Sequence, residues 1–230
     1  MLTDREKFRK GHLLVRPRIH VHTSSATIGQ RTLGIDAIRD ALLYVPKNYD
    51  AAQPTPLAVM LHGAGGNAAH GLSIIHHLAD AHNIILLAPY ARSSSWDIIH
   101  DDQYGRDIIF INQALENVFS EYVIDTKRIA IGGFSDGASY ALCVGLTNGD
   151  LFTHILAFSP GFAFTSEVEG KPRIFISHGV QDDVLPINPC SRRIVPRLRK
   201  QGYEVIYEEF DGTHVLPPFV SEAAVRWFLM

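Results

Sequence analysis

Short apolar runs alternate with amphipathic segments along most of the chain. An apolar run that ends in turn residues predicts a buried strand, and apolar positions spaced by three or four residues predict a helix packed on such strands. The predicted strands cover residues 41–46, 57–63, 83–89, 128–133, 154–160, 173–179 and 204–210, and the predicted helices cover 71–82, 106–122, 138–146, 192–201 and 221–229.

This alternation predicts an α/β fold, with a mostly parallel central sheet and helices on both of its faces. We expect residues 41–230 to form one domain, which suits a chain of 230 residues. Residues 1–40 show no clear pattern. We expect them to form an N-terminal extension that is compatible with an edge strand.

Composition and charge exclude several classes of protein. Hydrophobic residues make up 46% of the chain and charged residues 20%, as in an ordinary folded domain. The formal net charge of -3 offers no basic surface for a nucleic-acid backbone or an anionic membrane. We therefore expect no nucleic-acid partner.

The N-terminal residues and the later segments contain no apolar stretch long enough for a signal peptide or a membrane span. The two cysteines, Cys143 and Cys190, are too few for a disulfide scaffold. These features favour a cytoplasmic protein without a membrane span. They leave the oligomeric state open.

A serine lies where a predicted strand meets a predicted helix. Gly133, Ser135 and Gly137 form a GxSxG pattern within IAIGGFSDGAS. A tight strand-to-helix turn needs small residues on both sides of a nucleophile, and it exposes the hydroxyl at the end of the sheet. We therefore expect Ser135 to be a nucleophile. The alternative is a glycine-rich turn with an idle serine.

A second glycine-rich loop, in LHGAGGN, follows an earlier strand. Glycines let backbone N–H groups approach a reacting carbonyl, so this loop is a candidate for one side of an oxyanion hole. We expect Ala64 to supply one N–H donor and Asp136, directly after the nucleophile, to supply the other. A phosphate-binding loop is the alternative, but GxGxxG and the lysine of a P-loop are both missing.

A serine hydroxyl needs a base to accept its proton, and the base needs a carboxylate to orient it. Asp182 follows the predicted strand RIFISHG, with Asp183 as the alternative acid, and His214 follows the last predicted strand in DGTHVLPP. All three stand where active-site loops gather, at the carboxyl ends of parallel strands. The order Ser135, Asp182, His214 is typical of an α/β-hydrolase.

Four further residues are candidates for the substrate pocket. His62 and Gly63 precede the proposed donor Ala64, and Trp96 and Asp97 follow the end of a strand. A polar surface loop is equally compatible with Trp96 and Asp97. No HExxH pattern occurs among the histidines around the helix predicted over 71–82, so we expect no metal site there.

The segments LHGAGGN, KRIAIGGFSDGAS, FISHGVQDDVLP and DGTHVLPP resemble the phospholipase/carboxylesterase family of α/β-hydrolases. The chain is also similar to polyhydroxybutyrate-depolymerase-like esterases, and the resemblance runs from about Ala41 to the C-terminus. It implies the α/β-hydrolase fold, cofactor-free hydrolysis of carboxylic esters, and Asp182 rather than Asp183 as the acid. Relatives often carry Gln where this chain has Asp136, which leaves the acyl or leaving-group preference open.

The sequence thus predicts a serine carboxylesterase that acts on small or short-acyl esters through a Ser-His-Asp triad and an acyl-enzyme. Its expected partner is a small-molecule ester, and it needs neither a cofactor nor a metal. A thioesterase or a lysophospholipase-type hydrolase would use the same groups, and a non-catalytic binding protein could keep the same fold. Matched oxygen and sulfur esters separate the first alternative, and turnover of any simple ester excludes the last.

Overall fold

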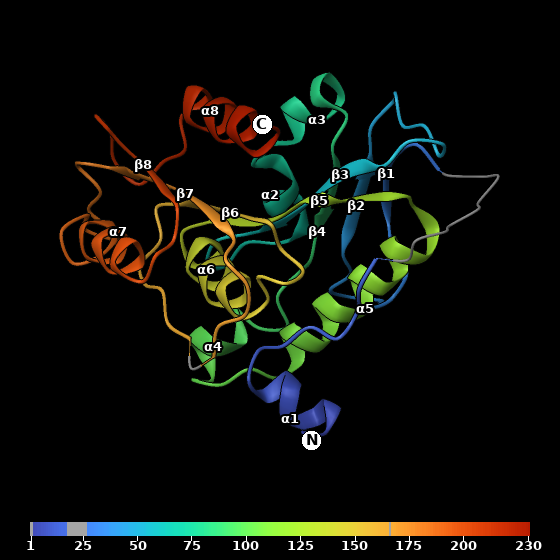
Figure 1. Cartoon of the computed structure of the whole chain (residues 1–230), viewed down its shortest axis with the longest axis horizontal. Coiled ribbons are helices and arrows are strands. Elements are labelled where there is room, and N and C mark those ends of the chain that lie inside the picture. Colours follow the sequence, from blue (N-terminus) through green and yellow to red (C-terminus); the bar gives the residue numbers. More distant parts are fainter. Residues whose placement is uncertain (1, 18–26, 166) are drawn as a thin grey trace.

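The computed structural model describes residues 2–17, 27–165 and 167–230. Its centre is a mostly parallel sheet, seen nearly edge-on in Figure 1, in which β2 is antiparallel to both of its neighbours and the other adjacent strands are parallel. In order across the sheet, the strands are β1 (Gly29–Thr32), β2 (Leu42–Val45), β4 (Ile85–Ala88), β3 (Thr55–Leu61), β5 (Ile124–Phe134), β6 (His154–Phe158), β7 (Arg173–Gly179) and β8 (Val205–Phe210).

Helices cover both faces of this sheet (Figure 1). On one face lie α2 (Ala68–Ser73), α3 (His76–His82) and α8 (Pro218–Phe228), and on the other lie α5 (Arg106–Glu121), α6 (Asp136–Thr147) and α7 (Ser191–Lys200). Two further short helices are α1 (Asp4–Arg9), near the start of the chain, and α4 (Asp97–His100), which precedes α5. The α/β fold predicted from the alternating pattern is confirmed.

The central strands have the burial that their apolar runs predict. Every residue of β3 and of β4 is buried, because helices cover the sheet on both sides at this point. The helix α5 buries only one of its faces, through residues that include Ile108, Ile111 and Leu115. Apolar periodicity alone was therefore enough to find these elements.

The helix predicted over residues 71–82 is wrong in one respect, because the chain forms two helices there. Between α2 and α3, Ile75 has a non-helical backbone (φ −132°, ψ 12°), and its side chain is fully buried. The break lets Leu72 from α2 and Leu78 from α3 enter the same core as Ile75. Apolar spacing continues through the break, so the pattern does not reveal the change of direction.

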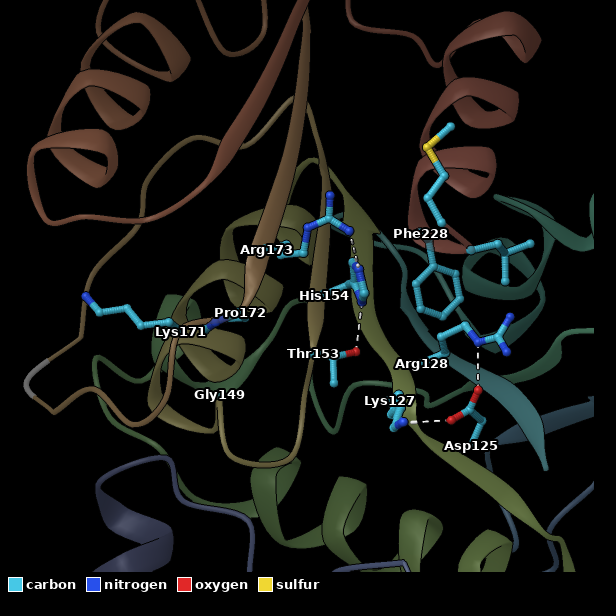
Figure 2. Close-up of a pocket in the computed structure, with 12 residues that line it drawn as sticks. Asp125, Lys127, Arg128, Gly149, Thr153, His154, Lys171, Pro172, Arg173 and Phe228 are labelled. Atoms are coloured by element: carbon cyan, nitrogen blue, oxygen red, sulfur yellow. Dashed lines mark hydrogen bonds and ion pairs between the residues drawn. The ribbon is translucent and has the colours of Figure 1, made fainter.

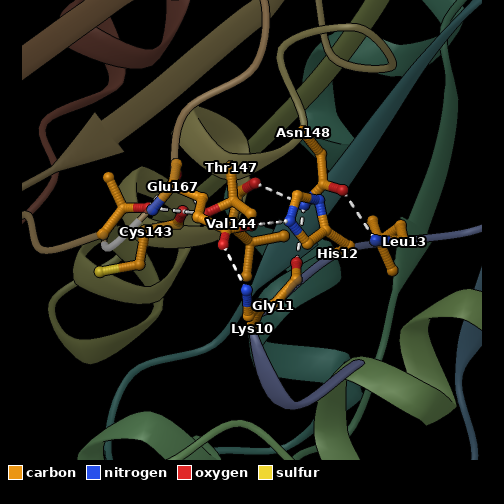
Figure 3. A network of polar contacts seen from close by, with 10 residues as sticks. Lys10, Gly11, His12, Leu13, Cys143, Val144, Thr147, Asn148 and Glu167 are labelled. Atoms are coloured by element: carbon orange, nitrogen blue, oxygen red, sulfur yellow. Dashed lines mark hydrogen bonds and ion pairs between the residues drawn. The ribbon is translucent and has the colours of Figure 1, made fainter. Parts of the chain in front are cut away.

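The N-terminal segment is fastened to the end of α6 by a buried amide (Figure 3). Asn148, which is fully buried, donates from Nδ2 to the carbonyl oxygen of Gly11 (2.8 Å) and accepts at Oδ1 from the N–H of Leu13 (2.7 Å). Nearby, Oε2 of Glu167 lies 2.8 Å from Nε2 of His12. The segment around residue 12 is therefore packed onto the sheet-and-helix body.

Other predictions concern the chain as a whole. The division at residue 40 stays a prediction: Gly29–Thr32 forms β1, and residues 1 and 18–26 lie outside the described residues. Cys143 and Cys190 are buried free thiols. Across residues 2–17, 27–165 and 167–230, no helix has the length and apolar character needed to cross a membrane.

Candidate active site

Ser135 occupies a strained turn between β5 and α6. Its backbone has φ 59° and ψ −122°, in a region that residues with a side chain rarely adopt. The flanking glycines explain how the turn closes: a Cβ on Gly133 would lie 2.6 Å from the carbonyl carbon of Gly137, and a Cβ on Gly137 would lie 2.2 Å from the carbonyl oxygen of Leu61. The GxSxG spacing is therefore a steric requirement of this turn.

Asp182 and His214 meet although they lie 32 residues apart in sequence. Asp182 follows β7, His214 follows β8, and Nδ1 of His214 lies 2.6 Å from Oδ2 of Asp182. The other carboxylate oxygen accepts the N–H groups of Val184 (3.0 Å) and Leu185 (2.7 Å). Asp182 is 5% exposed, whereas Asp183 is exposed to solvent.

These contacts control the charge of Asp182. Burial by itself raises the pKa of this carboxyl, but the hydrogen bonds from His214 and from the Leu185 N–H outweigh it and hold the pKa below its ordinary value. Asp182 is therefore ionised at neutral pH. An ionised carboxylate at this distance keeps a proton on Nδ1 of His214 and leaves Nε2 free to accept one.

A second histidine, which the sequence analysis did not single out, also contacts Asp182. His178 is fully buried, with Nε2 3.2 Å from Oδ2 of Asp182 and 2.8 Å from the carbonyl oxygen of Leu185. Its Nδ1 lies 2.7 Å from Oγ of Ser191. Burial lowers the pKa of His178, so the ring is neutral and helps to orient Asp182 without adding a charge. Its place in FISHG at the end of a strand was the available signal.

Ser135 and His214 border the same region. The rings of His214 and Phe134, the residue before Ser135, have centroids 4.7 Å apart. Within the described residues, the structure records no hydrogen bond between Oγ of Ser135 and His214. Catalytic hydrogen bonds are often long until a substrate is bound, so this geometry is compatible with a nucleophile and its base.

The loop after β3 packs directly against the turn at Ser135. A Cβ on Gly63 would lie 3.3 Å from Cβ of Ser135, which is closer than most side chains allow. Asp136 is the first residue of α6, where a backbone N–H has no partner within the helix. In the described part of the chain, no acceptor is recorded for the N–H of Ala64 or of Asp136. Both predicted donors are therefore available near Ser135.

A pocket of about 420 Å³ opens beside these residues. Of the four predicted pocket residues, His62 and Gly63 line it. Burial lowers the pKa of His62, so its ring is neutral. The rest of the lining mixes apolar side chains with His and Ser and comes from α2, α3, α8 and the loops beside Ser135, with His70, Ser73, Ile74, His77, Phe134, His214, Val215, Leu216, Pro218 and Ser221.

Trp96 and Asp97 do not line this pocket. Trp96 is fully buried, donates from Nε1 to the carbonyl oxygen of His62 (2.9 Å) and stacks on the ring of Tyr140. Asp97 is 4% exposed and begins α4. Both side chains are buried. Trp96 supports the loop that contains His62, and Asp97 is hydrogen-bonded to Asp107 on α5.

A different hollow, of about 630 Å³, lies at the opposite edge of the sheet, at the amino ends of β5, β6 and β7 (Figure 2). Basic side chains surround it, but Arg128 is paired with Asp125 (2.6 Å) and Arg173 with Glu204 (2.7 Å). Among the described residues, no group of three or more His, Cys, Asp or Glu side chains could hold a metal ion.

Residues 102–214 match the model of the phospholipase/carboxylesterase family. The chain is 31% identical over 155 residues to a bifunctional acetylxylan esterase/xylanase of Neocallimastix patriciarum, covering 64% of this chain and 22% of that protein. It is 29% identical over 183 residues to a probable feruloyl esterase C of Aspergillus oryzae, covering 74% of this chain and 66% of that protein. The chain thus spans less than two thirds of the length of these relatives.

Solved structures share the fold. A thermostable esterase superposes with a TM-score of 0.68 at 24% identity, covering 82% of this chain and 58% of that one. A phospholipase/carboxylesterase from Dyadobacter fermentans superposes with a TM-score of 0.65 at 19% identity, covering 90% of this chain and 100% of that one. Together with the sheet order and the family match over residues 102–214, these likenesses show that the chain has the α/β-hydrolase fold and resembles the phospholipase/carboxylesterase family.

Proposed function

We propose that this protein is a serine carboxylesterase in which Ser135 is the nucleophile, His214 the general base and Asp182 the acid that orients it. One observation carries the proposal: His214 contacts the buried Asp182 at 2.6 Å and packs against Phe134, the residue before Ser135, whose backbone has a strained, positive φ. A buried acid, an imidazole and a strained hydroxyl in one place are the parts that nucleophilic attack on an ester needs.

The first half of the reaction forms an acyl-enzyme. Oγ of Ser135 attacks the ester carbonyl carbon while Nε2 of His214 accepts the hydroxyl proton. The carbonyl oxygen becomes an oxyanion, which the N–H groups of Ala64 and Asp136 stabilise. The bond to the alcohol oxygen then breaks, and the departing alcohol takes the proton from His214.

The second half of the reaction releases the acid. Water attacks the acyl carbon and gives a proton to His214, and the bond to Oγ of Ser135 breaks as the hydroxyl regains that proton. Asp182 stays ionised throughout and stabilises the imidazolium each time it forms. The reaction consumes one water per ester and uses no cofactor.

The pocket beside Ser135 favours a compact acyl or aryl group. Its volume of about 420 Å³ and the apolar side chains of Ile74, Phe134 and Leu216 suit a short acyl chain or a single aromatic ring. Similarity to proteins named acetylxylan esterase and feruloyl esterase supports the same range of acids. We expect aryl acetate, aryl butyrate and feruloyl esters to be hydrolysed faster than esters of long-chain acids.

Active-site labelling tests the proposal. A fluorophosphonate probe should label the wild-type protein at Ser135 alone, and Ser135→Ala should abolish both labelling and hydrolysis of a short-chain aryl ester. Ser120→Ala is the matched control, because Ser120 is exposed on α5 and its Oγ donates to the carbonyl oxygen of Asn117 in the same helix. Labelling at another residue, or hydrolysis that survives Ser135→Ala, would contradict the proposal.

A further inference from the structure

Residues 91–97, which follow β4, touch the loop that carries the proposed donor Ala64. The N–H of Gly65 donates to the carbonyl oxygen of Ser94 (2.7 Å), and Nε1 of Trp96 donates to the carbonyl oxygen of His62 (2.9 Å). The N–H of Ala91 donates to Nε2 of His62 (3.1 Å). These contacts hold the chain on both sides of Ala64.

The same segment also reaches the second proposed donor. Oγ of Ser95, a residue that is 7% exposed, donates to Oδ2 of Asp136 at 2.5 Å. Asp136 begins α6 immediately after Ser135, so this contact fixes the residue whose N–H is the second proposed donor. One short loop therefore contacts both halves of the proposed oxyanion hole.

Two buried carboxyls anchor this loop to α5. Oδ2 of Asp107 accepts the N–H of Asp97 (2.7 Å), and Oδ2 of Asp97 accepts the N–H of Asp107 (3.0 Å). Asp107 also accepts the N–H of Arg92 (2.6 Å), and Asp97 also accepts the hydroxyl of Tyr140 (2.9 Å). The two acids are 4% and 1% exposed, so they bind the two ends of residues 91–97 from inside the protein.

We propose that Asp97 and Asp107 are positioning residues for the oxyanion hole: by fastening residues 91–97 to α5, they hold the backbone donors of Ala64 and Asp136 in place. This inference rests on the proposed function. A pair of buried acids is a costly way to join a loop to a helix, since apolar side chains could fill the same volume. The hydrogen bonds of such a pair hold the loop in one position, and two N–H donors that stabilise an oxyanion require such a fixed position.

Proton uptake by this pair provides a readout that distinguishes positioning from packing. Burial and the charge of Asp97 raise the pKa of Asp107 to about 6, and burial also raises the pKa of Asp97. A protonated carboxyl loses an acceptor, so the loop loosens as the pH falls through about 6. Tyr104, Tyr140 and Arg92 also interact with this pair of acids. Arg92 in turn interacts with Asp36, Arg39 and Asp40.

The test compares kcat and KM of Asp107→Asn and the wild type from pH 5 to pH 8, with an aryl acetate as the substrate. We expect kcat of the folded variant to fall by about 10- to 100-fold at pH 8 while KM changes by less than about threefold, because removal of one oxyanion donor costs about 10² to 10³. The ratio of wild-type to variant kcat should shrink below pH 6.

Two further variants keep the test decisive. Tyr140→Phe removes only the hydroxyl that bonds Asp97, and it should lower kcat by about tenfold even if Asp107→Asn fails to fold. Asp101→Asn is the control, since Asp101 is an exposed acid after α4 whose loss should leave kcat unchanged. Wild-type kcat in a folded variant, a pH-independent ratio, or a loss that appears only in KM or thermal stability would overturn the inference.

The same experiment separates this inference from the proposed function. If the wild type shows no hydrolysis that depends on Ser135, the proposed function fails and the inference fails with it. If hydrolysis depends on Ser135 and the Asp107 and Tyr140 variants retain wild-type kcat, only the inference fails.

Discussion

Asp182 and Asp183 are neighbouring acids with the same chemistry and different surroundings. Asp182 is buried, accepts two backbone N–H groups and contacts His214, whereas Asp183 is exposed. A single peptide bond therefore separates a carboxylate that can orient an imidazole from one that is solvated. At this scale, burial and partners decide the role of a residue more than its type does.

Replacing each acid by its amide tests this difference. Asp182→Asn should lower kcat for a short-chain aryl ester by about 10⁴-fold, because the amide favours the wrong tautomer of the histidine. Asp183→Asn should leave kcat within about twofold of the wild type. Steady-state kinetics of the two purified variants provide the measurement. A similar loss of kcat in both variants would contradict the assignment of Asp182 as the acid.

At the scale of an element, α6 connects the proposed nucleophile at its start with the N-terminal segment at its end. Asn148 caps this arrangement with bonds to Gly11, Leu13 and the carbonyl oxygen of Val144 in its own helix. All of these groups are in a buried environment, where an unpaired N–H or C=O is costly. Loss of one side chain would leave several backbone groups unsatisfied at once.

Asn148→Ala should lower the free energy of unfolding by about 2 to 4 kcal/mol, since each unsatisfied buried group costs about 1 to 3 kcal/mol. Urea denaturation followed by tryptophan fluorescence measures this change. Asn188→Ala is the matched control: Asn188 is exposed and accepts a hydrogen bond from the exposed Arg192, so its loss should change the stability by less than about 0.5 kcal/mol. Equal effects of the two variants would show that residues near position 12 are not held by Asn148.

The close packing of α2 on β3 reverses an intrinsic preference. Alanine is better than glycine inside a helix by about 1 kcal/mol. At Gly71, however, a Cβ would lie 2.5 Å from the carbonyl oxygen of Met60, which is backbone and has little freedom to move. We expect Gly71→Ala to destabilise the protein by about 1 to 3 kcal/mol.

Thermal and urea unfolding of Gly71→Ala test this expectation. Ser73→Ala, an exposed position on the same helix, should stay within about 0.5 kcal/mol of the wild type. A stabilised Gly71→Ala would mean that α2 has room to move away from the sheet.

At the scale of the whole molecule, the carboxyl ends and the amino ends of the parallel strands carry different groups. The carboxyl edge carries Ser135, Asp182 and His214, while the amino edge carries the basic hollow and His154 (Figure 2). His154 is 5% exposed, and its ring packs against Trp227 and Phe228. Burial first, and the charge of Arg173 second, lower the pKa of His154 from 6.5 to about 4. This histidine links global stability to pH at a distance from the proposed chemistry.

The sign of that link follows from where the proton binds. The unfolded chain takes up a proton on His154 near pH 6.5 and the folded protein only near pH 4, so the contribution to stability is present above pH 6.5 and is lost as the pH falls. Between pH 7 and pH 4.5 the wild type should lose about 2 kcal/mol from this residue alone. His154→Asn should lose that much less over the same interval.

Urea denaturation at the two pH values measures the change for each protein. His100→Asn provides the control, because His100 is exposed on α4 and its replacement should leave the pH dependence of the wild type intact. A His154 variant with the full wild-type pH dependence would place the titrating group elsewhere.

The sequence by itself determined the features that depend on near neighbours along the chain. Apolar runs and spacings predicted the strands from β2 to β8 and most helices, because strand and helix periods are local. The glycines around Ser135 predicted the turn, because GxSxG between a strand and a helix is a pattern of five consecutive residues. The order of Ser135, Asp182 and His214 predicted the carboxyl edge as their meeting place, since parallel strands all end there.

Tertiary structure alone decided the features that depend on residues far apart in sequence. The break at Ile75, the bonds of Asn148 to the N-terminal segment, the contact of His178 with Asp182 and the burial of Trp96 beneath the site all arise from packing between separate elements. A local sequence pattern cannot predict such contacts, because it stays the same whichever distant residues pack against it. Only the folded chain shows which polar groups are buried away from water and therefore need hydrogen-bond partners within the protein.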